Sequence, residues 1–294
     1  MIAEPTYLLG VGATKAGTTW LYNHLRAHPE CHLRAIKELH YFDTIEDGSY
    51  QRQLKVQRRY LAKVRDNRAR GVSNNTVSTR REGDVREWIS VLKDRAENVP
   101  GYLAYLSGGR GARRLVADIT PSYAMLPEAR LRAMASMAAD VRFLYLMRDP
   151  VARLWSNLRM AAARAGASED NVQNLARQLL DQALDGQASG TVDRGDYIGA
   201  ITRLRAAVPP GRLMITFQER LQTAEGLAEI CVFLGITPVP ADFTTRVLPG
   251  VPAEMTAEQI SRVRTLLAPQ YAFVARAFPD MPAAWRLNMA EGVA

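Results

Sequence analysis

The chain has 294 residues, of which 47% are hydrophobic and 23% charged, and its formal net charge is +8. This composition is typical of a packed globular protein and excludes a disordered or collagen-like chain. Its two cysteines, Cys31 and Cys231, lack the spacing of a metal site or a C-x-x-C motif. They exclude a disulfide-rich scaffold and indicate a reducing compartment.

The sequence contains neither a cationic leader followed by an apolar stretch nor a run of about 18 apolar residues. We therefore expect a soluble, cytoplasmic protein with no membrane span. The lysines and arginines are dispersed, without a basic tract, a zinc-finger spacing or an RNP pattern. We expect no nucleic-acid partner, because an anionic small molecule accounts for the positive charge equally well.

Strand-like and helix-like segments alternate along the chain. In chain order they are a strand at 7–12, a helix at 18–27, a strand or loop at 33–43, helices at 50–66 and 84–106, a strand at 114–119, a helix at 127–139, a strand at 141–147, helices from 150, at 169–185 and at 196–207, a strand at 213–217, a helix through 230, and a C-terminal helix from 256 toward 278. This alternation predicts an α/β fold with a parallel, doubly wound sheet.

No internal repeat or linker divides the chain, so we expect one domain over residues 1–294. Residues 67–83 are polar and lack periodicity, which predicts a mobile loop or lid. Residues 251–294 are expected to form a C-terminal helical segment, which opens with a capping box from Thr256 to Gln259.

The first motif is the string YLLGVGATKAGTTW at residues 7–20, where the first strand meets the first helix. It keeps the glycine spacing of the G-x-x-x-x-G-K-[ST] loop of ATP and GTP enzymes, but Thr18 stands at the lysine position and the lysine comes earlier, as Lys15. A helix N-terminus offers unpaired N–H groups and a positive dipole end to an anion. The hydroxyls of Thr18 and Thr19 and the charge of Lys15 add to this predicted anion site.

This loop resembles the 5′-phosphosulfate-binding loop of sulfotransferases that use 3′-phosphoadenosine 5′-phosphosulfate (PAPS). The resemblance implies a P-loop-like, three-layer fold, with a central and mainly parallel sheet flanked by helices. It also implies that Lys15 contacts the oxygen between phosphate and sulfur. The loop residues that would bind PAPS are Lys15, Ala16, Gly17, Thr18, Thr19 and Trp20.

A second motif, YLMRDPVARLWS, places Arg148 at a predicted strand end and Ser156 eight residues later on the next helix. Open α/β sheets bind their ligands at such strand ends. The pair resembles the family's 3′-phosphate-binding element, which implies that Arg148 and Ser156 bind the 3′-phosphate of PAPS. Arg153 is expected at the surface, and an additional phosphate contact is the alternative. Tyr197, in an R-x-x-Y segment, resembles a further nucleotide-binding position, although a core tyrosine fits the same pattern.

A third motif, KELHYFD at residues 37–43, resembles the K-E-x-H-F-F-D stretch of the heparan sulfate and other glycan sulfotransferases. The resemblance implies that Glu38 is the general base, since a carboxylate can accept the proton of an acceptor hydroxyl. His40 is the alternative base, because another branch of the family uses histidine. Sequence does not decide between the two, because that choice depends on geometry.

Two departures from the family pattern concern the acceptor and the nucleotide. Asp118 and Ile119 stand in DITPSY where the glycan branch has E-K-[ST]-P-x-Y, so we expect the acceptor pocket to lack one cation. This departure disfavours a highly sulfated glycan and leaves room for a neutral sugar, a lipid or a small metabolite. The segment RVLPG, which begins at Arg246, lacks the lysine of the Lys-Gly-rich nucleotide loop found in many relatives.

Together these motifs predict a bacterial-type soluble sulfotransferase that transfers the sulfuryl group of PAPS to an acceptor hydroxyl and releases adenosine 3′,5′-bisphosphate. The acceptor is expected to be a carbohydrate, a lipid or a small metabolite. No metal is expected, because no ligand cluster is visible and protein cations can neutralise the leaving group. The alternatives are a P-loop kinase that uses Mg-ATP and a non-catalytic nucleotide-fold scaffold. The helix patterns do not separate a core face from an interface, so they indicate no oligomeric state.

Overall fold

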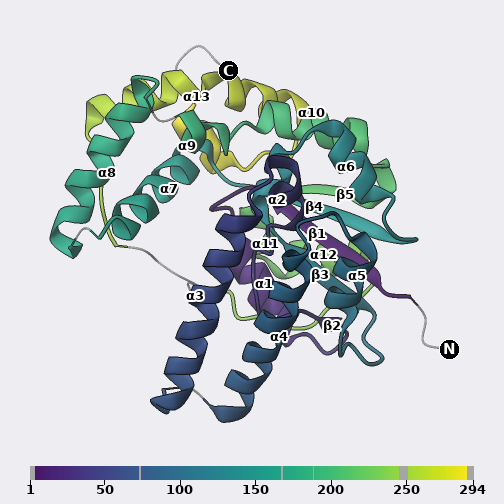
Figure 1. Ribbon diagram of the computed structural model, residues 1–294. Coiled ribbons are helices and arrows are strands. Elements are labelled where there is room, and N and C mark those ends of the chain that lie inside the picture. Colours follow the sequence, from purple (N-terminus) through teal and green to yellow (C-terminus); the bar gives the residue numbers. More distant parts are fainter. Residues whose placement is uncertain (1–3, 73, 167, 188, 245–250, 290–294) are drawn as a thin grey trace.

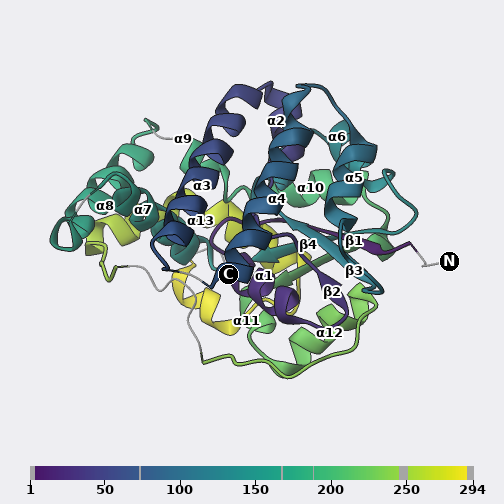
Figure 2. The ribbon, with the colours of Figure 1, turned by 60° about the horizontal axis from the view of Figure 1, so that its bottom comes forward.

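The computed structural model describes residues 4–72, 74–166, 168–187, 189–244 and 251–289. At its centre lies a five-stranded sheet with the order β2-β3-β1-β4-β5, in which every neighbouring pair is parallel. Helices α1, α11 and α12 cover one face, and α5, α6 and α10 lie on the other (Figures 1 and 2). The predicted three-layer α/β fold is confirmed.

The strands that build this sheet are β1 (Thr6–Gly12), β2 (Cys31–His32), β3 (Leu115–Ile119), β4 (Val141–Met147) and β5 (Leu213–Phe217). The helices are α1 (Thr18–Ala27), α2 (Tyr41–Asp47), α3 (Tyr50–Ala69), α4 (Asn75–Lys93), α5 (Val99–Ser107), α6 (Glu128–Ala135), α7 (Pro150–Arg164), α8 (Glu169–Leu184), α9 (Ser189–Asp193), α10 (Tyr197–Ala207), α11 (Gln218–Leu221), α12 (Ala224–Leu234) and α13 (Ala257–Ala277), with 3-10 turns η1 (Pro121–Met125), η2 (Pro210–Arg212) and η3 (Ala283–Asn288).

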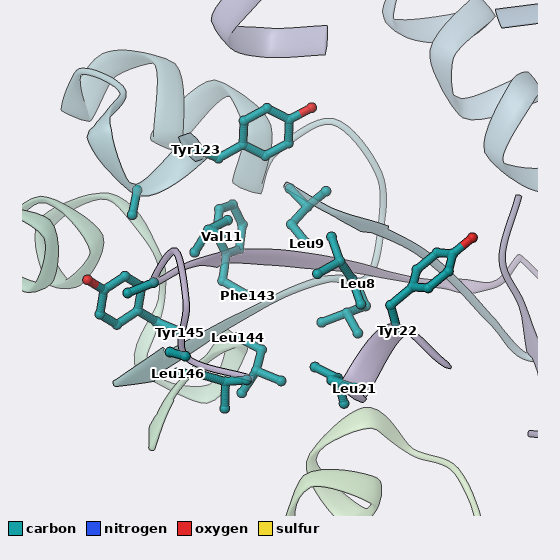
Figure 3. Packing of buried hydrophobic residues seen from close by; sticks show 14 of the residues in the cluster. Leu8, Leu9, Val11, Leu21, Tyr22, Tyr123, Phe143, Leu144, Tyr145 and Leu146 are labelled. Atoms are coloured by element: carbon teal, nitrogen blue, oxygen red, sulfur yellow. The ribbon is translucent and has the colours of Figure 1, made fainter. Parts of the chain in front are cut away.

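The core forms because β1 and β4 are apolar on both faces, as expected for central strands of a parallel sheet. In Figure 3, Leu9 and Phe143 lie on the side of Tyr123, whereas Leu144 and Leu146 lie on the side of Leu21 from α1. Leu9 and Phe143 are also paired in register across the two strands. Alternate side chains of each strand therefore hold both helical layers against the sheet.

The prediction of a mobile loop at 67–83 is wrong, because α3 extends to Ala69 and α4 begins at Asn75. The side chain of Asn74 caps α4 by accepting a hydrogen bond from the backbone N–H of Thr76 at 2.9 Å. The two helices pair along their length (Figure 1). The sequence looks aperiodic because most side chains near the turn are exposed, which leaves little apolar signal.

Segment 33–43, predicted as a strand or loop, is an irregular connection that becomes helical at Tyr41. The helix predicted at 84–106 is divided in two between Lys93 and Val99, and Pro100 occupies the first turn of α5. The capping box at Thr256 is present and opens α13. Within the described parts of the chain, no helix is long and apolar enough to cross a bilayer.

Candidate functional site

A cleft of about 750 Å³ opens where the sheet strands end. The segments that follow β1, β3, β4 and β5 contribute Lys15, Ser122, Arg148 and Gln218 to its walls. The carboxyl ends of parallel strands meet at one edge of a sheet, which is where ligands of open α/β folds bind. The topology thus brings together residues that lie up to two hundred positions apart in the sequence.

The turn after β1 depends on glycine at two positions. A side chain at Gly12 would place its Cβ 2.2 Å from the Tyr145 ring, and Gly17 has a left-handed φ of 87°. Gly17 is the N-cap of α1, and no side chain caps this helix. The first N–H groups of α1 therefore have neither an intrahelical acceptor nor a capping side chain, and the N-terminus of α1 can hold an anion.

Lys15 lies in this turn with a left-handed φ of 73°. Its ammonium group donates to the sulfur of Met160 at 3.7 Å, so the side chain reaches across the cleft to α7. Burial lowers the pKa of Lys15, and the charges of Arg148, Arg164 and Arg159 lower it further, while Glu38 opposes them. A lysine surrounded by unneutralised arginines is a site of strong positive potential.

Arg148 begins the segment after β4 and is held on two sides. Its guanidinium donates to the backbone oxygen of Lys15 at 3.0 Å, which ties the second motif to the first. The buried hydroxyl of Tyr197 accepts from the Arg148 backbone N–H at 3.1 Å and donates to its carbonyl. Tyr197 therefore holds the backbone of Arg148 in place and does not line the cleft.

Helix α7 presents one face to the cleft, and the sequence motifs identified only Ser156 on that face. The face begins at Ser156. Arg159, Met160 and Arg164 come three, four and eight positions later, and this spacing places them on the same side of a helix. That spacing was the available signal for the residues after Ser156. Neither arginine forms an ion pair with an acidic residue in the described parts of the chain.

Arg153, predicted at the surface, is fully buried one turn before Ser156 on the same helix and does not line the cleft. Its guanidinium donates to the Thr191 carbonyl at 3.3 Å and lies against Gly195, where an added Cβ would be 2.4 Å from Nη2. A surface position is therefore wrong for this arginine. Its place beneath the cleft depends on the segment around Gly195, which no local pattern predicts.

Glu38 and His40 face the cleft from the connection before α2, and both have left-handed backbone φ angles of 64° and 54°. The Glu38 carboxylate is ion-paired with Lys37 and its side chain is 41% exposed. Such unfavourable backbone conformations persist where the surrounding structure imposes them, and they are concentrated at functional sites.

His40 has an acidic partner of its own. Its Nδ1 donates to Asp43 at 2.7 Å, and the hydroxyl of Ser122 donates to the same carboxylate oxygen at 2.8 Å. The Nε2 atom lies 3.8 Å from the carboxylate of Glu38. Burial lowers the pKa of His40, but Asp43 and Glu38 outweigh it and raise the pKa above its ordinary value.

Asp118 supports the segment that carries Glu38 and His40 through hydrogen bonds within the fold. It is 2% exposed and accepts hydrogen bonds from Tyr123 at 2.7 Å, Tyr102 at 2.9 Å and Thr120 at 2.6 Å. The Tyr123 hydroxyl in turn accepts from the backbone N–H of Tyr41 at 2.9 Å, at the start of α2. Burial raises the pKa of Asp118, and the three hydrogen bonds oppose that rise only in part.

Ile119, which stands at the position of the family's lysine, is buried over Gly10 in the core and does not line the cleft. Lys37 and Arg194 instead add positive charge to the cleft walls. Glu38 is the one carboxylate among the cleft-lining residues. The segment that contains Arg246 lies outside the described residues.

Most of the predicted site residues meet in this cleft. They are Lys15, Gly17, Thr18, Thr19, Trp20, Glu38, His40, Arg148 and Ser156. Ala16 is buried beneath the loop and Tyr197 beneath Arg148, so these two support the site without lining it. The indole of Trp20 stacks on His24 and Phe243, with ring centroids 5.3 and 5.6 Å apart, and forms an aromatic wall.

The aspartates that a kinase could use for magnesium are engaged elsewhere. Asp149 caps α7 by accepting from Ala152 and also accepts from the hydroxyl of Tyr271 at 2.7 Å. Asp118 is saturated by three hydroxyl groups. Across the described residues, no group of three His, Cys, Asp or Glu side chains is arranged to hold a metal ion.

An open parallel sheet, a glycine turn at a helix N-terminus and a cation-rich cleft define the class of α/β proteins that bind phosphorylated nucleotides. Within that class, a model of the sulfotransferase family matches residues 8–240. The chain therefore belongs to the sulfotransferase family, and the predicted enzyme class is confirmed.

One solved structure supports this fold, and two others are similar to the chain at lower TM-scores. A sulfotransferase from Alicyclobacillus acidocaldarius matches with a TM-score of 0.63 and 19% identity, over 97% of this chain and 100% of that chain. The sulfotransferase domain of the Synechococcus PCC 7002 olefin synthase covers 90% of this chain and 94% of its own, with 18% identity and a TM-score of 0.46. The domain from the curacin biosynthetic pathway covers 84% and 82%, with the same identity and TM-score. No curated protein sequence matches the chain.

Proposed function

We propose that the cleft binds PAPS and transfers its sulfuryl group to a hydroxyl of a carbohydrate, lipid or small metabolite. The observation that carries the proposal is the meeting of three separate sequence motifs in one cleft. The motifs supply an anion-binding turn, a strand-end arginine with a helical serine, and a single carboxylate. A kinase function has no comparable support, because Asp118 and Asp149, the candidate magnesium ligands, accept hydrogen bonds from tyrosines within the fold.

The donor set suits a ligand with two anionic ends. Lys15, Thr18 and Thr19 and the first N–H groups of α1 would hold the phosphosulfate, and Arg148 and Ser156 the 3′-phosphate. Trp20 offers an aromatic face for the adenine ring. When bound, PAPS supplies a sulfuryl group attached to a phosphate leaving group.

In the proposed step, the acceptor oxygen forms a bond to sulfur while the bond between sulfur and the 5′-phosphate oxygen breaks. Lys15 would stabilise the negative charge that develops on the departing oxygen. The proton of the acceptor hydroxyl would pass to the carboxylate of Glu38, whose side chain is open to the cleft. The positive charges in the cleft walls favour the anionic donor before and during this step.

The geometry favours Glu38 over His40 as the base. His40 donates through Nδ1 to Asp43, and its raised pKa favours the imidazolium form, which cannot accept a proton. We assign His40 a positioning role, in which its positive charge, 3.8 Å from the carboxylate of Glu38, orients that carboxylate. Resemblance to the glycan branch depends on the motif at 37–43, so the acceptor class stays part of the proposal.

The first test is calorimetric titration of adenosine 3′,5′-bisphosphate without magnesium. We expect binding by the unmodified protein and a loss of about 10- to 100-fold for Arg148→Ala, because a hydrogen bond to a charged group contributes about 1.5–3 kcal/mol. Arg132→Ala, on an exposed turn of α6, is the matched control and should bind normally. Magnesium-dependent ATP binding without binding of the bisphosphate would contradict the proposal.

The second test is transfer of radiolabel from PAPS to a panel of sugars, lipids and metabolites. We expect Lys15→Met to lower the transfer rate by about 100- to 1,000-fold, the range seen when one charge-stabilising donor is lost. Transfer that is unaffected by this change would remove Lys15 from the mechanism. Absence of transfer by the unmodified protein to every acceptor would favour a non-catalytic scaffold.

A further inference from the structure

The positive charge of this protein is concentrated on one helical hairpin. Residues 50–93, which span α3 and α4, contain 12 Lys and Arg against 4 Asp and Glu, a net +8 that equals the charge of the entire chain. The remaining residues carry 26 charges of each sign. The expectation that the basic residues are evenly dispersed is therefore wrong. The hairpin extends beyond the sheet as an arm (Figures 1 and 2).

The acidic residues of the hairpin do not neutralise its outer surface. Asp84 is buried and binds Arg34 of the sheet body, and Glu87 binds the same guanidinium. Glu82 pairs with two arginines of α3, and Asp66 pairs with Arg70. Each carboxylate of the hairpin is thus in an ion pair with another residue. Among the described residues, several other cations of α3 have no acidic partner.

The cations left over lie on the outer side of α3. This helix buries Gln53, Leu54, Gln57 and Val64. Arg52, Lys55, Arg59 and Lys63 recur at spacings of three and four on the opposite side and are exposed. In the described parts of the chain, Lys55, Arg58, Arg59 and Lys63 form no ion pair. The name α3 basic stripe is used below for the exposed lysines and arginines of α3 without an ion pair in the described parts of the chain, which are Lys55, Arg58, Arg59 and Lys63.

The end of the hairpin is apolar as well as basic. Val72 and Val77 are 66% and 46% exposed, and Arg68, Arg70 and Arg80 are exposed around them. Aromatic side chains that could stack on bases are not presented here, because Trp88 is fully buried and Tyr60 is half-buried. The α3 basic stripe is also absent from the cleft walls, so an anionic acceptor in the cleft would not neutralise it.

We propose that the α3–α4 hairpin docks the protein onto a lipid bilayer that carries anionic headgroups. Basic residues attract such a surface, and small exposed apolar groups at the end of the arm can enter the boundary between headgroups and acyl chains. The phosphate backbone of a nucleic acid attracts the same cations but gives exposed valines no apolar surface to enter. The hairpin extends away from the sheet (Figure 1), so a broad surface can reach it.

The test is co-sedimentation of the full chain with vesicles of phosphatidylcholine that contain about 30% phosphatidylserine, with pure phosphatidylcholine vesicles as reference. We expect binding only to the anionic vesicles, and we expect added salt to weaken it because exposed charges are screened. Replacing the α3 basic stripe by glutamine should reduce binding at least about tenfold. Val72→Ser with Val77→Ser should reduce it by a smaller, few-fold factor.

The matched control removes the same charge from other exposed arginines outside the cleft, which are Arg113, Arg132, Arg276 and Arg286. Binding retained by this control and lost by the stripe variant supports the proposal. Equal loss in both variants would overturn it, because net charge alone would then suffice. Binding to heparin or duplex DNA that the stripe variant loses, without vesicle binding by the unmodified protein, would also overturn it.

Thermal unfolding and titration of adenosine 3′,5′-bisphosphate on each variant separate this proposal from the proposed activity. The stripe variant should unfold at the temperature of the unmodified protein and bind the bisphosphate normally. Membrane docking can therefore fail while nucleotide binding persists, and nucleotide binding can fail while docking persists.

Discussion

Two carboxylates, Glu38 and Asp118, lie on either side of the segment before α2 and have opposite surroundings. Glu38 lies at the cleft wall, 41% exposed, with a charged partner in Lys37. Asp118 is 2% exposed and accepts three hydrogen bonds from hydroxyl groups. Glu38 lines the cleft and can reach an acceptor bound there, whereas Asp118 does not line it.

The two carboxylates have different roles at the same segment. Asp118 fixes Tyr123, which holds the backbone of Tyr41 and so orients the connection that carries Glu38 and His40. The left-handed backbone at both catalytic candidates needs such support, because that conformation is unfavourable for residues other than glycine. Asp118 thus stabilises this segment, and Glu38 is the proposed base.

The largest effect should come from the open carboxylate. Glu38→Gln removes the proposed base while keeping size and polarity, so we expect the turnover number to fall by about 100- to 10,000-fold. The affinity for adenosine 3′,5′-bisphosphate and the unfolding temperature should stay unchanged. Radiolabel transfer, calorimetry and thermal unfolding measure the three quantities. Normal turnover by a variant that binds nucleotide would remove Glu38 from the mechanism.

The buried carboxylate should affect folding rather than the chemical step. Asp118→Ala leaves the buried hydroxyls of Tyr102 and Tyr123 without their acceptor, and we expect the free energy of unfolding to fall by about 3 kcal/mol. Denaturant titration measures this loss. Asp118→Asn is the control, because its amide oxygen can accept from both tyrosines and Thr120 can turn to accept from the amide nitrogen. Loss of turnover in Asp118→Ala without a loss of stability would contradict the structural role of Asp118.

The same pair of variants tests the raised pKa of Asp118. The folded state holds the proton of this carboxyl more tightly than the unfolded state does, so folding favours the protonated form. The contribution of Asp118 to stability should therefore fall as pH rises from the ordinary aspartate range through its raised pKa. Asp118→Asn cannot ionise and should lack this dependence in unfolding titrations at several pH values.

The smallest effect should come from His40, which lies between the two regions. We expect His40→Gln to lower turnover by no more than about tenfold, since a positioning residue does not accept the proton. Its raised pKa means that its stabilising contribution is complete below the ordinary histidine range and is lost as pH rises through the folded value. Unfolding titrations should show this loss in the unmodified protein and not in the variant.

The pH dependence of turnover separates the two candidate bases. If His40 accepted the proton, the rate would rise as the imidazolium loses its charge, and His40→Gln would abolish both the rise and most of the rate. A rate that does not rise across this range, with turnover retained in the variant, assigns the proton to Glu38. Either result decides which of Glu38 and His40 accepts the proton.

The sequence by itself determined four of the five strands, the capping box of α13 and the motifs, because these depend on local spacing. The apolar strands at β1 and β4 and the capping box at Thr256 are examples, and so is the glycine turn before α1. Hydrophobic periodicity and capping act over a few residues, so they can be read without knowing what lies nearby in space. The family assignment has the same origin, since its motifs are short and contiguous.

Only the tertiary structure decided which polar groups are open and which are enclosed. Ile119 and Arg153 lie in the interior although their neighbours in sequence reach the cleft, and residues 67–83 gain their helical order by pairing α3 with α4. The face of α7 with Arg159 and Arg164 became part of the site because the ends of distant strands converge there. Burial and convergence depend on contacts between residues far apart in the chain, and a local pattern carries no information about such contacts.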